Sequence, residues 1–176
     1  MKNIGIAEFQ KVSFFQFLAD WSDIYKMKQE EYEKEEVQNI YNALTLPKRS
    51  TKGSCGYDFV CPCGISLKPN ESIKIPTGMR CKINNGWALK LYPRSSLGFQ
   101  YRMQLDNTVG IIDSDYFHSD NEGHILVKIT NDSKETKTLK IKSGERFIQG
   151  IFLPYGIIKS DTTEAVRNGG FGSTGK

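Results

Sequence analysis

The chain has 176 residues, enough for one domain with an adequate core or for a domain of roughly 130 residues plus an extension. Hydrophobic residues make up 38% and charged residues 25%, which is typical of a globular protein and unlike a disordered one. The net charge is +4, and no Lys/Arg block is long enough for a nucleic-acid-binding arm. No apolar run approaches the roughly 18 residues of a membrane helix, and the first residues do not begin a signal peptide. We therefore expect a cytoplasmic protein that binds neither membranes nor nucleic acid directly.

Residues 1–44 are predicted to form a helical extension. Apolar residues recur at spacings of three and four between Ser13 and Leu44, which indicates helices with one buried face. Ser13 can be the N-cap and Gln16 the N3 partner of a capping box, while Val12 and Phe17 can form a hydrophobic staple. We interpret the aromatic face as core or subunit packing rather than as a ligand site.

Short alternating runs and turn signals dominate from residue 45 onward. Strands are predicted at 72–76, 79–83, 87–91, 124–130 and 146–153. Residues 84–86, with the sequence Asn-Asn-Gly, predict a type I′ hairpin turn, and residues 142–145 predict a second turn. This pattern favours an all-β sandwich or barrel over residues 45–165. Residues 166–176, rich in glycine, are either a flexible end or a loop that orders on a ligand.

Four cysteines are expected to be free thiols in a reducing compartment: Cys55, Cys61, Cys63 and Cys81. The pair Cys61 and Cys63 raises the alternative of a metal site. One intervening residue is not the usual ligand spacing, however, and both histidines, His118 and His124, lie far away in the sequence.

Two blocks carry groups suited to a phosphorylated ligand. In the tail, glycines expose backbone N–H groups that can bind phosphate, Arg167 adds a charge, and Phe171 could stack on a base. A flexible chain end is the alternative there. After the predicted strand at 87–91, Arg94 offers a forked donor set and Ser95 and Ser96 add hydroxyls. A polar turn is the alternative for that block.

The candidate acid–base group is Asp113, which follows two isoleucines and could act as general base for a water molecule. Asp115 would share a face with it in an extended segment but not in a turn, and an acidic turn ending a strand is the alternative. Arg146 and Gln149 could serve phosphate binding and water positioning, and Asp58 follows a glycine turn.

These five blocks, in this order, resemble the five motifs of the trimeric dUTP diphosphatase (dUTPase) family over about residues 45–176. The chain reads GSCGYDF from Gly53, PRSSLG from Pro93, NTVGIIDSDY from Asn107, RFIQGIF from Arg146 and RNGGFGSTG from Arg167. The resemblance implies a jelly-roll-like all-β barrel and a homotrimer with shared active sites. It also implies hydrolysis of dUTP to dUMP and pyrophosphate, with Mg²⁺ bound mainly through the triphosphate and water attacking the α-phosphorus.

Roles in catalysis and phosphate binding follow from the same resemblance. Asp113 would activate the water and contact the 3′-hydroxyl, while Gln149 would hold the water or α-phosphate oxygens. Asp58 would bind a water molecule of the Mg²⁺ hydration shell. The groups implied to hold or support the phosphates are Arg94, Ser95, Ser96, Arg146, Arg167, Ser173 and Thr174.

The resemblance also implies which residues recognise the nucleoside. Asn107 and nearby backbone, including Gly110, would read the uracil edge, and Tyr116 would lie against the deoxyribose and exclude a 2′-hydroxyl. Phe171, followed by Gly172, would cap the base.

The chain departs from the family pattern in four places. Cys55 replaces a small alanine and must be accommodated, and Arg167 lies one residue nearer the double glycine. Six residues separate Tyr116 from Gly123 where one is common, so residues 117–122 are predicted to form an extended hairpin loop. The helical region lies outside the pattern. The alternatives are a deaminase of the same broad fold acting on dCTP, and a regulatory protein that uses this fold to bind a partner.

Overall fold

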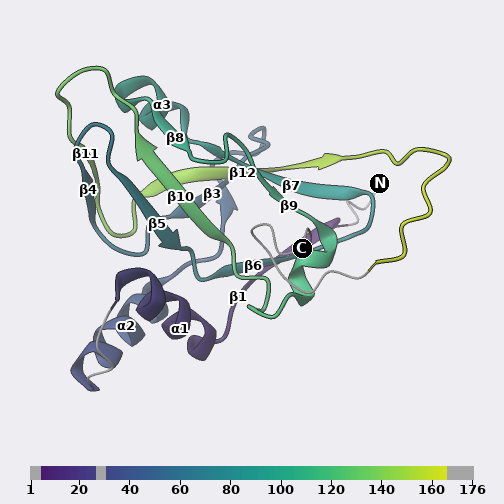
Figure 1. Ribbon diagram of the computed structural model, residues 1–176, viewed down its shortest axis with the longest axis horizontal. Coiled ribbons are helices and arrows are strands. Elements are labelled where there is room, and N and C mark those ends of the chain that lie inside the picture. Colours follow the sequence, from purple (N-terminus) through teal and green to yellow (C-terminus); the bar gives the residue numbers. More distant parts are fainter. Residues whose placement is uncertain (1–4, 27–30, 166–176) are drawn as a thin grey trace.

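The computed structural model describes residues 5–26 and 31–165 and shows two helices packed against one end of a largely β structure (Figure 1). The helices are α1 (Phe14–Tyr25), α2 (Glu31–Ala43) and α3 (Ser95–Tyr101), with a 3₁₀ helix η1 (Ser114–His118). The strands are β1 (Ala7–Lys11), β2 (Lys48–Arg49), β3 (Tyr57–Val60), β4 (Ile65–Leu67), β5 (Ser72–Pro76), β6 (Met79–Ile83), β7 (Trp87–Pro93), β8 (Met103–Leu105), β9 (Gly110–Ile112), β10 (Leu126–Asn131), β11 (Leu139–Ile141) and β12 (Arg146–Pro154).

Within the described residues, the strands form four small antiparallel sheets. The largest has the order β2-β3-β12-β7-β9, a second has the order β5-β10-β8, and β1-β6 and β11-β4 form two pairs. Apolar side chains on the inward faces build one continuous core that includes Phe59, Ile75, Leu89 and Phe147. Strands with one face in the core alternate inward apolar and outward polar side chains. The arrangement of elements confirms the predicted all-β core with a helical N-terminal region.

Helix α1 begins as predicted, with the Ser13 hydroxyl accepting the Gln16 backbone N–H at 3.1 Å. The second half of the predicted capping box is wrong. The Gln16 side chain donates forward to Asp20 at 2.8 Å, and the Ser13 backbone N–H donates instead to the Glu122 carboxylate at 2.7 Å. Phe17 and Trp21 are buried in the core, which confirms the packing role of the aromatic face.

The strand β1 was not predicted. It pairs antiparallel with β6, from Ala7 opposite Ile83 to Lys11 opposite Met79, so the two long helices connect one strand of the β structure to another. Its sequence, AEFQK, carries one large apolar side chain. That residue, Phe9, contacts the rings of Phe59 and Phe152 at centroid distances of 5.5 and 5.7 Å. Partners far away in the sequence therefore define this strand.

The turn after β6 differs from the predicted type I′ hairpin. The Trp87 N–H donates to the Asn84 carbonyl at 3.2 Å, and Gly86, with φ +85°, is the one described residue of this turn with a positive φ. One positive φ at the third position is the type II pattern, which does not match the twist of a two-residue hairpin. The flanking strands accordingly separate, β6 pairing with β1 and β7 pairing with β12 and β9. The turn at 142–145 is confirmed by the hydrogen bond from Glu145 N–H to the Lys142 carbonyl.

Residues 117–122 are compact, so the predicted extended hairpin loop is wrong. They complete the 3₁₀ helix η1 and continue into a turn. The Arg80 guanidinium lies 3.6 Å from the centroid of the Phe117 ring and donates to the Phe117 carbonyl at 3.1 Å, which holds the segment against β6. Gly123 allows this close return: its φ is +70°, and a Cβ there would lie 2.7 Å from the Tyr116 carbonyl oxygen.

Candidate active site

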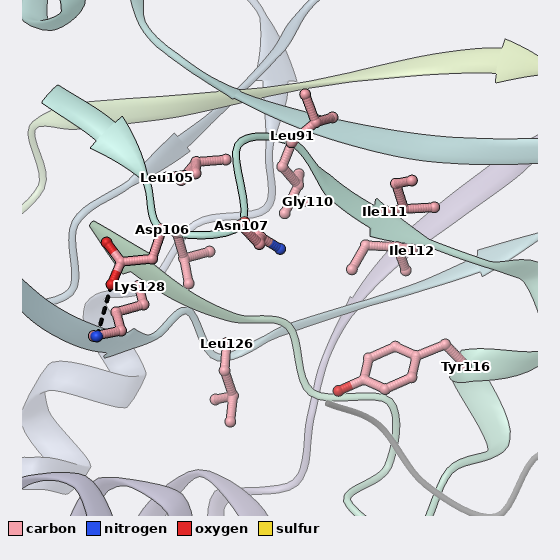
Figure 2. A pocket seen from close by; sticks show the side chains of 12 residues that line it. Leu91, Leu105, Asp106, Asn107, Gly110, Ile111, Ile112, Tyr116, Leu126 and Lys128 are labelled. Atoms are coloured by element: carbon pink, nitrogen blue, oxygen red, sulfur yellow. Dashed lines mark ion pairs between the residues drawn. The ribbon is translucent and has the colours of Figure 1, made fainter. Parts of the chain in front are cut away.

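A cavity of about 580 Å³ opens between β7, β9, η1 and β10 (Figure 2). Three of the residues predicted to bind the nucleoside line it together: Asn107, Gly110 and Tyr116. Gly110 pairs with Leu91 across β9 and β7, and a Cβ at this glycine would lie 3.1 Å from the Leu91 Cβ. The glycine therefore lets the cavity extend down to the sheet. These dimensions suit a base and a sugar.

Tyr116 forms one side of the cavity, with its hydroxyl directed toward the interior in Figure 2. The side chain is buried, and its hydroxyl donates to the His124 carbonyl at 2.8 Å. The Asn121 amide donates to the same hydroxyl at 3.0 Å. Two hydrogen bonds on one phenol fix the ring, so the shape of this wall is set before any ligand binds.

The opposite side of the cavity carries an ion pair that no motif in the sequence indicates. Lys128 Nζ lies 2.7 Å from Asp106 Oδ2, and both residues line the cavity. Partial burial acts to raise the pKa of Asp106, but hydrogen bonds from Lys128 and Thr130 hold it below its ordinary value. Because Asp106 and Lys128 lie on different strands or turns, their spacing in the sequence offers no signal for the pair.

Asp113 follows β9 directly and is half-buried at the start of η1. Asp115 lies inside η1 and is exposed. Of the two arrangements considered for these carboxylates, the structure has the turn, so they do not share the face of a strand. The apolar neighbours Ile111 and Ile112 line the cavity beside Asp113.

A second polar group gathers around Asp58. Its carboxylate lies 3.2 Å from Arg94 Nε through one oxygen and 3.2 Å from Arg146 Nη1 through the other. The Ser50 hydroxyl joins this group, donating to Asp58 at 2.6 Å and accepting from Arg146 at 2.7 Å. Two guanidinium groups share one carboxylate, which leaves a net positive charge suited to phosphate. Ser50 was not predicted, because an exposed serine in a polar stretch gives no signal in the sequence.

Gln149 lies beside Asp58 on the same face of the sheet. On β12 it stands opposite Asp58 of β3 and Tyr92 of β7, and its amide donates to the Pro93 carbonyl at 3.4 Å. A Cβ at Gly56 would lie 2.5 Å from Gln149 Oε1, so a glycine is required for the amide to occupy this position. Ser95 and Ser96 open α3 directly after Arg94 and are exposed.

The cavity and the polar group lie on opposite faces of the same sheet. Residues opposite each other on paired strands share a face, and neighbours along a strand alternate. Gly110 is opposite Leu91, whereas Gln149 is opposite Tyr92, the next residue along β7. Accordingly, the described lining of the cavity includes none of Asp58, Arg94, Arg146 and Gln149. One chain therefore places the residues predicted to bind the nucleoside on a different face from those predicted to bind phosphate.

The predicted contacts in the tail, Arg167, Phe171, Gly172, Ser173 and Thr174, lie outside the described residues. Within residues 5–26 and 31–165, no cluster of three or more metal-binding side chains occurs, and no helix is long and apolar enough to cross a membrane. The four cysteines are free thiols, as predicted, and burial raises the pKa of Cys61 to about 12. Cys55 is exposed, so its larger side chain needs no room in the core.

Comparison with known proteins identifies the chain. Residues 42–175 match the family model of dUTPase. The chain belongs to the dUTPase family. The match begins at the end of α2, so α1 and nearly all of α2 lie outside this dUTPase region.

Named relatives and solved structures agree with the assignment of this chain to the dUTPase family. It is 40% identical over 145 residues to a deoxyuridine 5′-triphosphate nucleotidohydrolase of Lactococcus lactis, covering 80% of this chain and 95% of the relative. A protein of the same name from Tolumonas auensis is 37% identical, with 78% and 91% covered. The crystal structure of dUTPase from Streptococcus mutans superposes with a TM-score of 0.58 at 34% identity, covering 65% of this chain and 89% of that one.

Proposed function

We propose that this dUTP diphosphatase converts dUTP to dUMP and pyrophosphate by attack of water on the α-phosphorus, which limits uracil in DNA and supplies dUMP. The observation that carries the proposal is the pairing of a nucleoside-sized cavity with a separate, positively charged group of polar side chains. In this arrangement the cavity suits the nucleoside of the substrate, and the positively charged group suits its triphosphate.

The cavity binds deoxyuridine. Asn107 and the backbone near Gly110, which line the cavity, form hydrogen bonds with the uracil edge. The Tyr116 ring lies against the deoxyribose. Since its hydroxyl is held by the His124 carbonyl and the Asn121 amide, the ring cannot withdraw to admit a 2′-hydroxyl. The sugar is thus selected by a fixed wall rather than by a hydrogen bond.

The chemical step uses Asp113 and Gln149. Asp113 takes a proton from the attacking water as the new bond to the α-phosphorus forms, and pyrophosphate leaves with the electrons of the broken P–O bond. Gln149 holds the water or an α-phosphate oxygen through its amide. Arg94 and Arg146 exchange their contacts with Asp58 for contacts with phosphate oxygens, and the exposed hydroxyls of Ser95 and Ser96 add donors.

Members of the dUTPase family use Mg²⁺. The residues present fit an ion that is held mainly by the substrate, because Asp58 is a lone carboxylate beside the phosphate-binding arginines. Asp58 would hold it through a bound water molecule, and the ion would neutralise charge on the triphosphate. The described residues offer no cage of several carboxylates that would bind Mg²⁺ without substrate.

We further propose that the active protein is a homotrimer with shared sites. Gln149 and Asp58 face away from the cavity of their own chain, so they serve a substrate bound in the cavity of another copy. On this proposal, residues 1–44 are an addition to the dUTPase core of residues 45–165, and residues 166–176 close over the bound nucleotide. Arg167, Ser173 and Thr174 then contact the outer phosphates, while Phe171, beside Gly172, covers the base.

Pyrophosphate release from dUTP, dTTP, dCTP and UTP in the presence of Mg²⁺ tests the proposed reaction. Rapid release from dUTP, with the other three much slower, is the expected result. Equal rates on all four nucleotides, or no release from dUTP, would show that the proposal is wrong. Faster release of ammonia from dCTP would instead identify a deaminase.

A further inference from the structure

The segment from Tyr116 to Ile125 connects the cavity to the helical region. Its first residue lines the cavity, and its last residues lie beneath α1. The Tyr116 hydroxyl donates to the carbonyl of His124, and the Asn121 amide contacts both this carbonyl and the hydroxyl. The position of the Tyr116 ring therefore depends on where His124 is held.

The His124 side chain is fully buried and is held from two sides. Its Nε2 atom accepts the Gly78 backbone N–H at 2.8 Å, and its Nδ1 atom lies 2.5 Å from an Asp20 carboxylate oxygen on α1. Because Nε2 is an acceptor, the proton directed at Asp20 is on Nδ1. This carboxylate also accepts the Gln16 side-chain amide. Asp20 thus determines the orientation and the tautomer of the imidazole.

Gly78 lies close to Leu44, just after α2, and to Phe17 of α1. With φ +72°, it is the backbone donor to His124, and a Cβ here would lie 2.3 Å from a Leu44 methyl carbon and 3.4 Å from the Phe17 ring. Leu44 and Phe17 therefore pack against Gly78, whose backbone N–H donates to the His124 imidazole. Helix α1 contacts His124, behind the cavity wall, and the described residues of α1 and α2 do not line the cavity.

We propose that Asp20 is a positioning residue for the active site: through His124 it fixes the Tyr116 ring, so the helical region sets the discrimination between deoxyribose and ribose. The inference rests on the proposed function, since it assigns the sugar to the Tyr116 side of the cavity. Asp20 and His124 do not line the cavity, and they act through the backbone carbonyl that holds the phenol.

The ratio of kcat/KM for dUTP to that for UTP measures this effect. Asp20→Ala is expected to lower the ratio about tenfold, with KM for dUTP raised more than kcat is lowered. Asp20→Asn keeps an oxygen acceptor for the Nδ1–H group and is expected to restore most of the preference. Asp23→Ala, at an exposed position of the same helix, is the matched control and is expected to behave as wild type.

A second measurement is independent of the substrate. The ring resonances of Tyr116 in protein with isotope-labelled tyrosine, assigned with Tyr116→Phe, are expected to move in Asp20→Ala and not in Asp23→Ala. If Asp20→Ala does not fold, Asp20→Glu, which displaces the carboxylate by one methylene, is expected to give smaller changes in the same direction. A folded Asp20 variant with unchanged ring resonances and an unchanged nucleotide ratio would overturn the inference. Failure of the wild type to prefer dUTP would instead refute the proposed function and leave the resonance result as the test of the contact.

Discussion

Glu122 accepts two hydrogen bonds from Ser13, 109 positions earlier in the chain: one from the backbone N–H and one from the hydroxyl, both at 2.7 Å. Ser13 is the N-cap of α1, and Glu122 ends the insertion between Tyr116 and Gly123. The helical region and this insertion, both departures from the dUTPase pattern, therefore hold each other in place. A carboxylate at the first turn of a helix also interacts favourably with the unpaired N–H groups there.

Glu122→Ala is expected to lower the free energy of unfolding by about 1–2 kcal/mol, because it leaves the first turn of α1 without this acceptor. Partial burial acts to raise the pKa of Glu122, but the Ser13 donors and Arg80 hold it below its ordinary value, which agrees with a favourable contact. Urea unfolding measures the change. Glu35→Ala, at an exposed position of α2, is the control, and an equal loss in both variants would contradict a role specific to Glu122.

Stability contributed by Asp20 is expected to depend on pH. Burial acts to raise its pKa, but hydrogen bonds from His124 and Gln16 lower it below the ordinary 3.8. A carboxyl with a lowered folded-state pKa stabilises the protein above its unfolded value, and this contribution is lost as pH falls through the folded value. The stability difference between wild type and Asp20→Asn should therefore shrink between about pH 6 and about pH 3. Asp23→Asn controls for the loss of one acidic group, and a difference that grows at low pH would refute the assignment.

Local patterns in the sequence predicted the elements that are determined by side-chain spacing and by turn residues close by in the chain. The N-cap at Ser13 and the strands at 72–76 and 79–83 follow from the sequence, since side-chain spacing and turn residues determine them. The strand at 7–11 could not be found, because its apolar partners come from elsewhere in the fold. The contact of Glu122 with Ser13 also leaves no trace in local spacing.

The sequence names candidate site residues one by one, whereas their positions relative to one another within the chain depend on the fold. The motifs gave Asp58, Arg94 and Gln149 separate roles, and the structure places Asp58 against Arg94 and opposite Gln149. These residues face away from the cavity because of the register of β7 with β12 and β9. No single motif contains the residues that set this register. Ser50 completes the group through two hydrogen bonds that depend on the fold.

Gly56→Ala is expected to reduce kcat by roughly 10- to 100-fold while changing the unfolding free energy little. The added Cβ would lie 2.5 Å from Gln149 Oε1, the end of a flexible side chain that can move away at small cost. The displaced amide would then no longer hold the water or the α-phosphate oxygen. Gly53→Ala is the matched control, because a Cβ there meets no described atom within 4 Å. Equal kcat values for the two variants would remove Gln149 from the proposed role.

Mixing two inactive variants tests whether the sites are shared. Asp113→Asn alone is expected to slow turnover by about 10²–10⁴-fold, and Gln149→Ala is expected to impair the same step. If Asp113 of one subunit works with Gln149 of another, trimers reassembled from equal amounts of the two variants contain some sites with both groups intact. A cyclic arrangement with one such contact per site predicts recovery of about a quarter of wild-type activity.

Recovery of activity distinguishes sites shared between subunits from sites formed within one chain. Sites formed within one chain would stay defective in every mixture. Reassembly after mild denaturation, followed by pyrophosphate release from dUTP, measures it. Asp113→Asn mixed with wild type supplies the reference for subunit exchange, and Asp113→Asn carried through the same procedure alone gives the baseline. The opposite faces occupied by Gln149 and Gly110 favour the shared arrangement. Activity at the baseline in mixtures that have exchanged subunits would place both groups in one chain and require a rearrangement of β7, β9 and β12.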